Sequence, residues 1–155
     1  MFDTLTDSWY VWLGLTVVAA VTVGVAVGLP TVPPPDAESA AGTIDGVAGR
    51  TAPTSATHRV TASRIRIDRD RLTLRNDAGV AHASFAFGPV LAVGDGPLAA
   101  VAGGAVVTSV FESRAAFDEA ITAARQTAAV WRVGSRLLIR HVSWGGEDVT
   151  LVAVR

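Results

Sequence analysis

The sequence contains no cysteine and no lysine. Without cysteine, the chain has no disulfide framework, no thiolate ligand for zinc or an iron–sulfur centre, and no thiol nucleophile. All thirteen basic residues are arginines, and fourteen acidic residues oppose them, so that the formal net charge is −1. A chain with so small a net charge lacks the overall positive field that is typical of nucleic-acid-binding proteins. We therefore predict no nucleic-acid partner.

Charged residues are also missing from the whole stretch between Asp7 and Asp36. As a helix, the apolar run Val11–Leu29 would extend about 28 Å, which is close to the hydrocarbon thickness of a bilayer, about 30 Å. Aromatic side chains at one end of the run are typical of the headgroup level. The sequence thus predicts an N-terminal tail and a transmembrane helix over residues 1–29, with the lipid bilayer as its surroundings. It predicts single-pass localisation in the cell membrane.

A cleaved signal peptide is the alternative interpretation of this run. The residues before the run include Asp3 and Asp7 but no basic residue, and the run is longer than the apolar part of a typical signal peptide. We therefore expect the helix to stay attached. No basic residue lies close enough to either end to orient it by the positive-inside rule. The Pro-rich segment and the strand-rich sequence that follow favour an extracytoplasmic C-terminal domain.

Small side chains recur every four residues along the predicted helix, at Thr16, Ala20, Gly24 and Gly28. Such a strip allows the backbone of a second helix to approach closely, so the four residues are a candidate helix-packing site. The alternative is that glycine and alanine are simply common in membrane helices.

After the predicted helix, the sequence divides into two further parts. Residues 30–57 are rich in Pro, Ala and Thr and are predicted to form a spacer that contains a short helix. Residues 58–155 alternate between apolar and polar positions, and one helical pattern begins after Ser113 and runs to about Val130. We therefore predict an α+β fold, in which a small antiparallel-sheet domain carries one packed helix on one face.

Four arginines alternate with apolar residues in the two short strands predicted within residues 63–75. Ile65, Ile67, Leu72 and Leu74 are expected on one face, and Arg64, Arg66, Arg71 and Arg75 on the other. The arginine side is a candidate surface for an acidic protein partner or for anionic headgroups. The alternative is a solvated face in which Asp68 and Asp70 partly neutralise the charge.

Candidate catalytic residues are few. His58, His82 and His141 do not have the spacing of metal ligands. Ser84 and Ser143 each follow a histidine by two residues on a predicted strand, but neither lies in a nucleophile elbow. We therefore predict that the chain is not an enzyme, has no cofactor and no metal site, and offers no identifiable small-molecule substrate.

Several segments together resemble one uncharacterised family of haloarchaeal membrane-anchored proteins, which have an N-terminal helix, a Pro-rich spacer and a small domain. These segments are Ile44-Asp45, Arg71–Gly79, His82–Pro89, Trp131–Leu137 and Gly145–Val149. The resemblance covers nearly the whole chain and implies an association with type IV pilus-like assembly and secretion genes. It implies no catalytic residue.

Two functions follow as expectations. The first is a non-enzymatic structural or assembly component of an envelope or pilus-like secretion system, with protein partners in the membrane or envelope. The second is a surface-tethered ligand-binding module, which would need a pocket with convergent polar groups.

Overall fold

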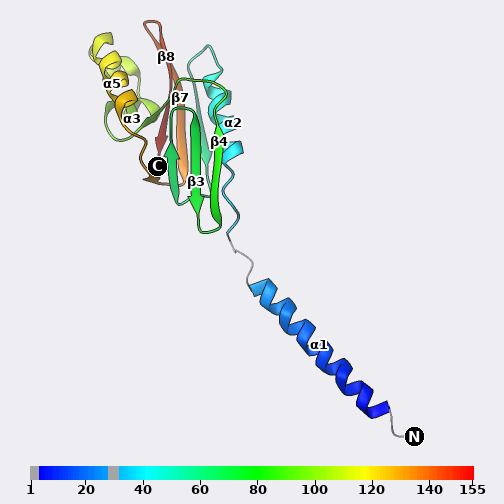
Figure 1. Cartoon of the computed structure of the whole chain (residues 1–155). Coiled ribbons are helices and arrows are strands. Elements are labelled where there is room, and N and C mark those ends of the chain that lie inside the picture. Colours follow the sequence, from blue (N-terminus) through cyan, green and yellow to red (C-terminus); the bar gives the residue numbers. More distant parts are fainter. Residues whose placement is uncertain (1–3, 28–31) are drawn as a thin grey trace. The chain divides into compact units, whose positions relative to one another are not determined.

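The computed structural model describes residues 4–27 and 32–155 of the chain (Figure 1). Its contacts divide the chain into two compact units, Met1–Val32 and Pro33–Arg155.

The first unit contains helix α1 (Thr4–Val27), where the transmembrane span was predicted. No helix within residues 4–27 and 32–155 combines the length and the apolar character needed to cross a membrane. The predicted transmembrane helix is therefore wrong, as is the single-pass localisation in the cell membrane with an extracytoplasmic C-terminal domain.

The second unit is built on two four-stranded sheets, here called sheet A and sheet B. Sheet A has the order β1-β7-β8-β5, and sheet B has the order β4-β3-β2-β6. The strands of sheet A are β1 (Thr54–Arg59), β7 (Arg136–Trp144), β8 (Glu147–Val154) and β5 (Val90–Val93). The strands of sheet B are β4 (Gly79–Ser84), β3 (Arg71–Asn76), β2 (Arg64–Ile67) and β6 (Arg132–Val133). All pairs are antiparallel except β5 with β8, which is parallel.

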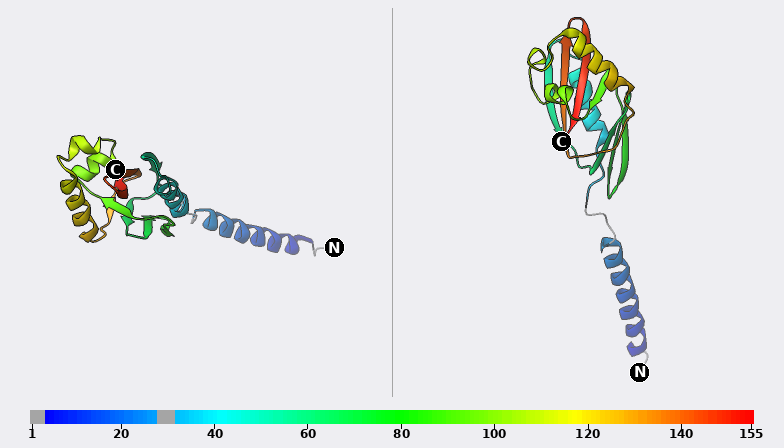
Figure 2. Two further views of the ribbon diagram at one scale, coloured as in Figure 1. Left: turned by 90° about the horizontal axis from the view of Figure 1, so that it is seen from above. Right: turned by 90° about the vertical axis from the view of Figure 1, so that its left-hand side faces the viewer.

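Sheet A is covered on both faces (Figure 2). Helix α2 (Ala37–Ala48) and sheet B pack on one face, where Ile44, Leu72 and Leu137 are fully buried. Three helices cover the other face, which buries Phe117 and Leu151. They are α3 (Pro97–Ala102), α4 (Val107–Val110) and α5 (Arg114–Gln126). Because both faces are buried, six consecutive residues of β8 are buried and the strand shows no polar side.

The predicted α+β class with antiparallel strands is confirmed, but the layers differ from the single sheet with one packed helix. The predicted helix after Ser113 is α5, and the Ser113 hydroxyl accepts the N–H of Ala116 at 3.2 Å. It ends at Gln126 rather than near Val130, because Thr127 is already extended. The short helix expected in the spacer is α2, with Asp36 as its N-cap.

Candidate binding surfaces beside the β2–β3 turn

Strand pairing places the four predicted arginines on one side of sheet B. Arg64 is opposite Arg75, Arg66 is opposite Thr73 on β3, and Arg71 is opposite Ser84 on β4. The residues between them face the core, where Ile65 pairs with Leu74 and Ile67 with Leu72. We call the side that carries Arg64, Arg66, Arg71 and Arg75 the arginine face.

The charges of the arginine face are mostly uncompensated. Arg66 is paired with Asp68, at 3.2 Å between Nε and Oδ2. Within the described part of the chain, Arg64, Arg71 and Arg75 are exposed and form no ion pair. Like charges directly opposite each other on neighbouring strands destabilise a sheet. The stability of the sheet therefore does not explain why Arg64 and Arg75 lie opposite each other.

A threonine lies near the middle of the arginine face. Thr73 is buried although it points to the outer side, and its hydroxyl forms a hydrogen bond with Nδ1 of His82 at 3.1 Å. His82 is opposite Thr73 on β4. The face therefore carries arginine, threonine and histidine groups in adjacent register positions.

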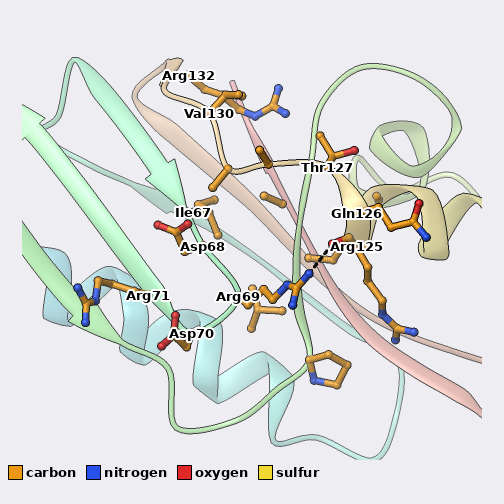
Figure 3. Close-up of a pocket in the computed structure, with 17 residues that line it drawn as sticks. Ile67, Asp68, Arg69, Asp70, Arg71, Arg125, Gln126, Thr127, Val130 and Arg132 are labelled. Atoms are coloured by element: carbon orange, nitrogen blue, oxygen red, sulfur yellow. Dashed lines mark hydrogen bonds between the residues drawn. The ribbon is translucent and has the colours of Figure 1, made fainter.

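A cleft of about 740 Å³ lies next to the arginine face. One wall is the β2–β3 turn with Asp68, Arg69 and Asp70, and another is the start of β5. The third wall is formed by the end of α5, the following segment 127–130 and Arg132 (Figure 3). The cleft thus joins segments that are about sixty residues apart in the sequence.

The arginines on different walls of the cleft make different contacts. Arg69 reaches from the β2–β3 turn and donates from Nη2 to the carbonyl oxygen of Arg125, at 3.0 Å (Figure 3). Arg125 itself is paired with Glu147 on β8. Arg132 is half-buried and lies against Gly94, where an added Cβ would be 2.8 Å from its Nη1 atom. Among the described residues, Arg132 has no acidic partner.

Residues 3–142 match the model of a family of unknown function, DUF7283. The chain belongs to this family. The matched range begins ahead of α1 and extends into β7, so it includes the arginine face and all the walls of the cleft. No curated protein and no solved structure matches the chain. The sequence-based prediction of an uncharacterised family is thus confirmed as membership of a family of unknown function.

Each histidine of this DUF7283 chain contacts a threonine hydroxyl through Nδ1. His58 contacts Thr43 at 2.9 Å, His82 contacts Thr73 at 3.1 Å, and His141 contacts Thr150 at 3.3 Å. In the described ranges, no hydrogen bond joins His82 to Ser84 or His141 to Ser143. Nor do these ranges contain a group of three or more histidine and acidic residues that could hold a metal ion.

The predicted helix-packing residues lie on α1 or beyond it. Thr16 and Ala20 are exposed on α1, and the Thr16 hydroxyl donates to the carbonyl of Trp12 at 2.8 Å. Gly24 also belongs to α1, whereas Gly28 lies outside the described residues. The helix-packing site stays a prediction.

The cleft of this DUF7283 chain was not predicted from the sequence. The sequence indicates Asp68 and Asp70 only as neighbours of the arginine side, and Arg132 only as part of a resemblance. No pattern in the sequence indicates that the end of α5 packs beside that turn. The contact depends on the layer order, in which α5 and sheet B lie on opposite faces of sheet A and meet at the β5 edge.

Proposed function

We propose that the chain is a non-enzymatic assembly component whose Pro33–Arg155 unit docks to an acidic protein partner through the arginine face. The observation that carries the proposal is the uncompensated charge of Arg64, Arg71 and Arg75, which lie together on one exposed side of sheet B. Arginine suits such a role because its planar guanidinium can bind a carboxylate through two parallel hydrogen bonds.

The charge of the face is local rather than general. The chain as a whole has a formal net charge of −1, so a distant acidic protein is not attracted to it by net charge. A localised cationic patch instead fixes the side on which a partner docks and raises its association rate.

A protein partner is favoured over single-stranded nucleic acid by the neighbours of the arginines. The positions beside them in the strand pairing are Thr73, Val80, His82, Ser84 and Val133. Single-stranded nucleic-acid sites usually add aromatic side chains on which the bases stack, and these positions include no Phe, Tyr or Trp. The sequence resemblance to haloarchaeal proteins near pilus-like assembly and secretion genes supports a subunit of such a system as the partner.

The test uses poly-L-glutamate as a probe of acidic binding, with fluorescence anisotropy as the readout. The wild-type chain is expected to bind it at low ionic strength and to release it as salt is added. The double variant Arg64→Gln/Arg75→Gln should bind at least tenfold more weakly.

A second arginine pair provides the matched control. Arg59 and Arg136 are also directly opposite each other, on β1 and β7, and both are exposed. The variant Arg59→Gln/Arg136→Gln removes the same charge and should retain the wild-type affinity. Equal losses in the two double variants would mean that only net charge matters, and the proposal would then be wrong.

The cleft favours a second candidate function, a ligand-binding module. A volume of about 740 Å³ lies within the range of small-molecule sites, and the walls carry apolar residues together with arginines and two aspartates, Asp68 and Asp70. Thermal-shift measurements with small carboxylates and phosphates would test it. A ligand of this site should raise the melting temperature of the wild-type chain but not that of Arg132→Gln.

A further inference from the structure

Strand β5 has a free edge. Among the described residues it pairs only with β8, and it is the last strand of the order β1-β7-β8-β5. A free edge presents unpaired backbone N–H and C=O groups, which are a template for a further strand. Natural edges are usually protected by a covering segment, a proline or a bulge.

The pairing with β8 determines which backbone groups of β5 are free. The N–H of Thr150 donates to the carbonyl of Pro89 at 3.1 Å, and Val90 is the Cα partner of Thr150. In a parallel ladder alternate residues bond to the same neighbour, so Leu91 bonds to β8. The N–H and C=O groups of Val90 and Ala92 therefore point away from β8. Among the described residues, none accepts from or donates to these groups on that side.

The cleft lies along this free edge. Residues Pro89, Val90, Leu91 and Ala92 all line it. The side chains of β5 alternate between the two cores, with Val90 on the side of sheet B and Leu91 on the side of α5. A strand added beside β5 would alternate in the same way. Its side chains would contact Ile67 and the β2–β3 turn on one side, and Ala124 with segment 127–130 on the other.

The charge of the cleft, where Arg69, Arg71, Arg125 and Arg132 outnumber the two carboxylates Asp68 and Asp70, specifies what kind of strand would fit. The guanidinium of Arg132 lies beside Gly94, at the end of β5, and no acidic residue of the described ranges pairs with it. Arg69 uses only Nη2 on the carbonyl of Arg125, so its other N–H donors are available. Buried or half-buried arginines need an anionic partner to compensate for lost hydration.

We propose that the cleft binds an extended acidic peptide segment of another protein, which adds as a strand to the free edge of β5. Backbone hydrogen bonds to Val90 and Ala92 supply the affinity, and Arg69 and Arg132 select carboxylate side chains. This mode is known in general as β-augmentation. It needs a backbone edge, which distinguishes it from the small-molecule function considered above, and it does not depend on the arginine face.

Charge argues against a second copy of the chain as the occupant. Two β5 edges paired about a two-fold axis would bring Arg132 and Arg69 of both copies into one short interface. Like charges juxtaposed at an interface disfavour such a pairing. A foreign acidic segment adds no further arginine to this interface.

The experiment measures binding of labelled seven-residue peptides to the full chain by fluorescence anisotropy. The probes form a library that has Asp or Glu near both ends and alternating Val, Thr and Ala between them. We expect members of the library to bind, with an affinity that falls as salt is added. Absence of binding by every member would overturn the proposal.

Backbone recognition is tested with two N-methylated versions of the peptide that binds most tightly. One version is methylated at the backbone nitrogens of its even positions, and the other at those of its odd positions. N-methylation removes N–H donors but keeps the side chains and their charges. Strand addition predicts that one of the two peptides loses binding at least tenfold while the other retains it. If both peptides bind as well as the parent, the attraction is only electrostatic and the proposal is wrong.

The contribution of the β5 backbone to peptide binding is tested with Ala92→Pro. This substitution removes an N–H that points away from β8, in an edge strand, where proline is tolerated. Ala92→Val is the matched control, because it adds bulk at the same position and keeps the N–H. Binding should fall at least tenfold in Ala92→Pro and remain in Ala92→Val. Equal binding by both variants, or a dimer of the free chain that Ala92→Pro dissociates, would contradict the proposal.

Discussion

The carboxylate of Asp45 on α2 accepts the backbone N–H of Phe87, at 3.1 Å from its Oδ1 atom. The same carboxylate accepts the N–H of Ala86, at 3.0 Å to Oδ1 and 3.1 Å to Oδ2. Asp45 therefore joins the last turn of α2 to the chain that follows β4. Its neighbour Ile44 is fully buried between sheet A and sheet B. Together the two residues fix α2 on the core, which gives a structural reason for the Ile44-Asp45 segment in the sequence resemblance.

We predict that Asp45→Ala lowers the free energy of unfolding by about 2 kcal/mol. Hydrogen bonds to a charged group contribute about 1.5–3 kcal/mol, and their loss leaves backbone donors unpaired. Urea denaturation of the Pro33–Arg155 fragment is the measurement. Asp77→Ala is the control, because Asp77 is exposed and makes no side-chain hydrogen bond to the described residues. Similar effects of the two substitutions would contradict the structural role of Asp45.

The contacts of α2 also predict where the folded unit begins. A fragment of residues 33–155 should unfold cooperatively, whereas a fragment of residues 58–155, the boundary predicted from the sequence, should not. The shorter fragment lacks the buried side chains of Ile44 and Val47, each of which contributes about 1.5–3 kcal/mol by its burial. A loss of this size is large compared with the total stability of a domain, about 5–15 kcal/mol. Circular dichroism melts of the two fragments provide the comparison, and a cooperative melt of 58–155 would restore the boundary at residue 58.

Local patterns in the sequence predicted individual elements well. Alternation predicted the inward side of β2 and β3, and Ser113 predicted the start of α5. These features depend on near neighbours, whose spacing is visible in the chain itself. The arginine face is visible for the same reason, since it follows from alternation on two adjacent strands.

The arrangement of the layers could not be predicted in this way. The parallel pairing of β5 with β8 joins residues about sixty positions apart, and nothing in Val90–Val93 specifies its partner. The Ala-rich sequence of α2 is similar in composition to a spacer. Alanine fits both an exposed helix and a closely packed one, so composition does not distinguish the two. The cleft depends on both of these long-range features, so it becomes evident only in the folded structure. The transmembrane prediction was wrong, since no helix of the described residues has the length and apolar character of a membrane span.

Two glycines should respond in opposite ways to substitution by alanine. At Gly46 on α2 an added Cβ meets nothing within 4 Å, so Gly46→Ala should raise stability by about 0.5–1 kcal/mol through its helix propensity. At Gly134 the added Cβ would lie 2.6 Å from Cγ1 of Val154 and 2.8 Å from the carbonyl oxygen of Arg155. Since one of these neighbours is backbone, Gly134→Ala should lower stability by about 1–3 kcal/mol. Thermal unfolding of the two variants checks the difference, and a shift of the same sign in both would contradict it.

The Arg64–Arg75 pair allows stability and binding to be separated. Arg75→Glu places a carboxylate opposite Arg64 and replaces a repulsion by an ion pair. We predict a gain in the free energy of unfolding of about 0.5 kcal/mol at low salt, because exposed cross-strand pairs contribute about that much. The gain should disappear in 1 M salt, where screening acts within about 3 Å. Urea denaturation at the two salt concentrations is the measurement.

The same variant should lose binding to poly-L-glutamate, since it reverses the charge of the arginine face. Arg136→Glu is the matched control, because it makes the same change opposite Arg59 on sheet A. It should gain similar stability and keep its affinity for the probe. A stabilised Arg75→Glu variant that still binds poly-L-glutamate like the wild type would show that the uncompensated charge has no role in docking. Loss of binding together with a gain in stability would instead show that the face retains an unfavourable arginine pair for the sake of its partner.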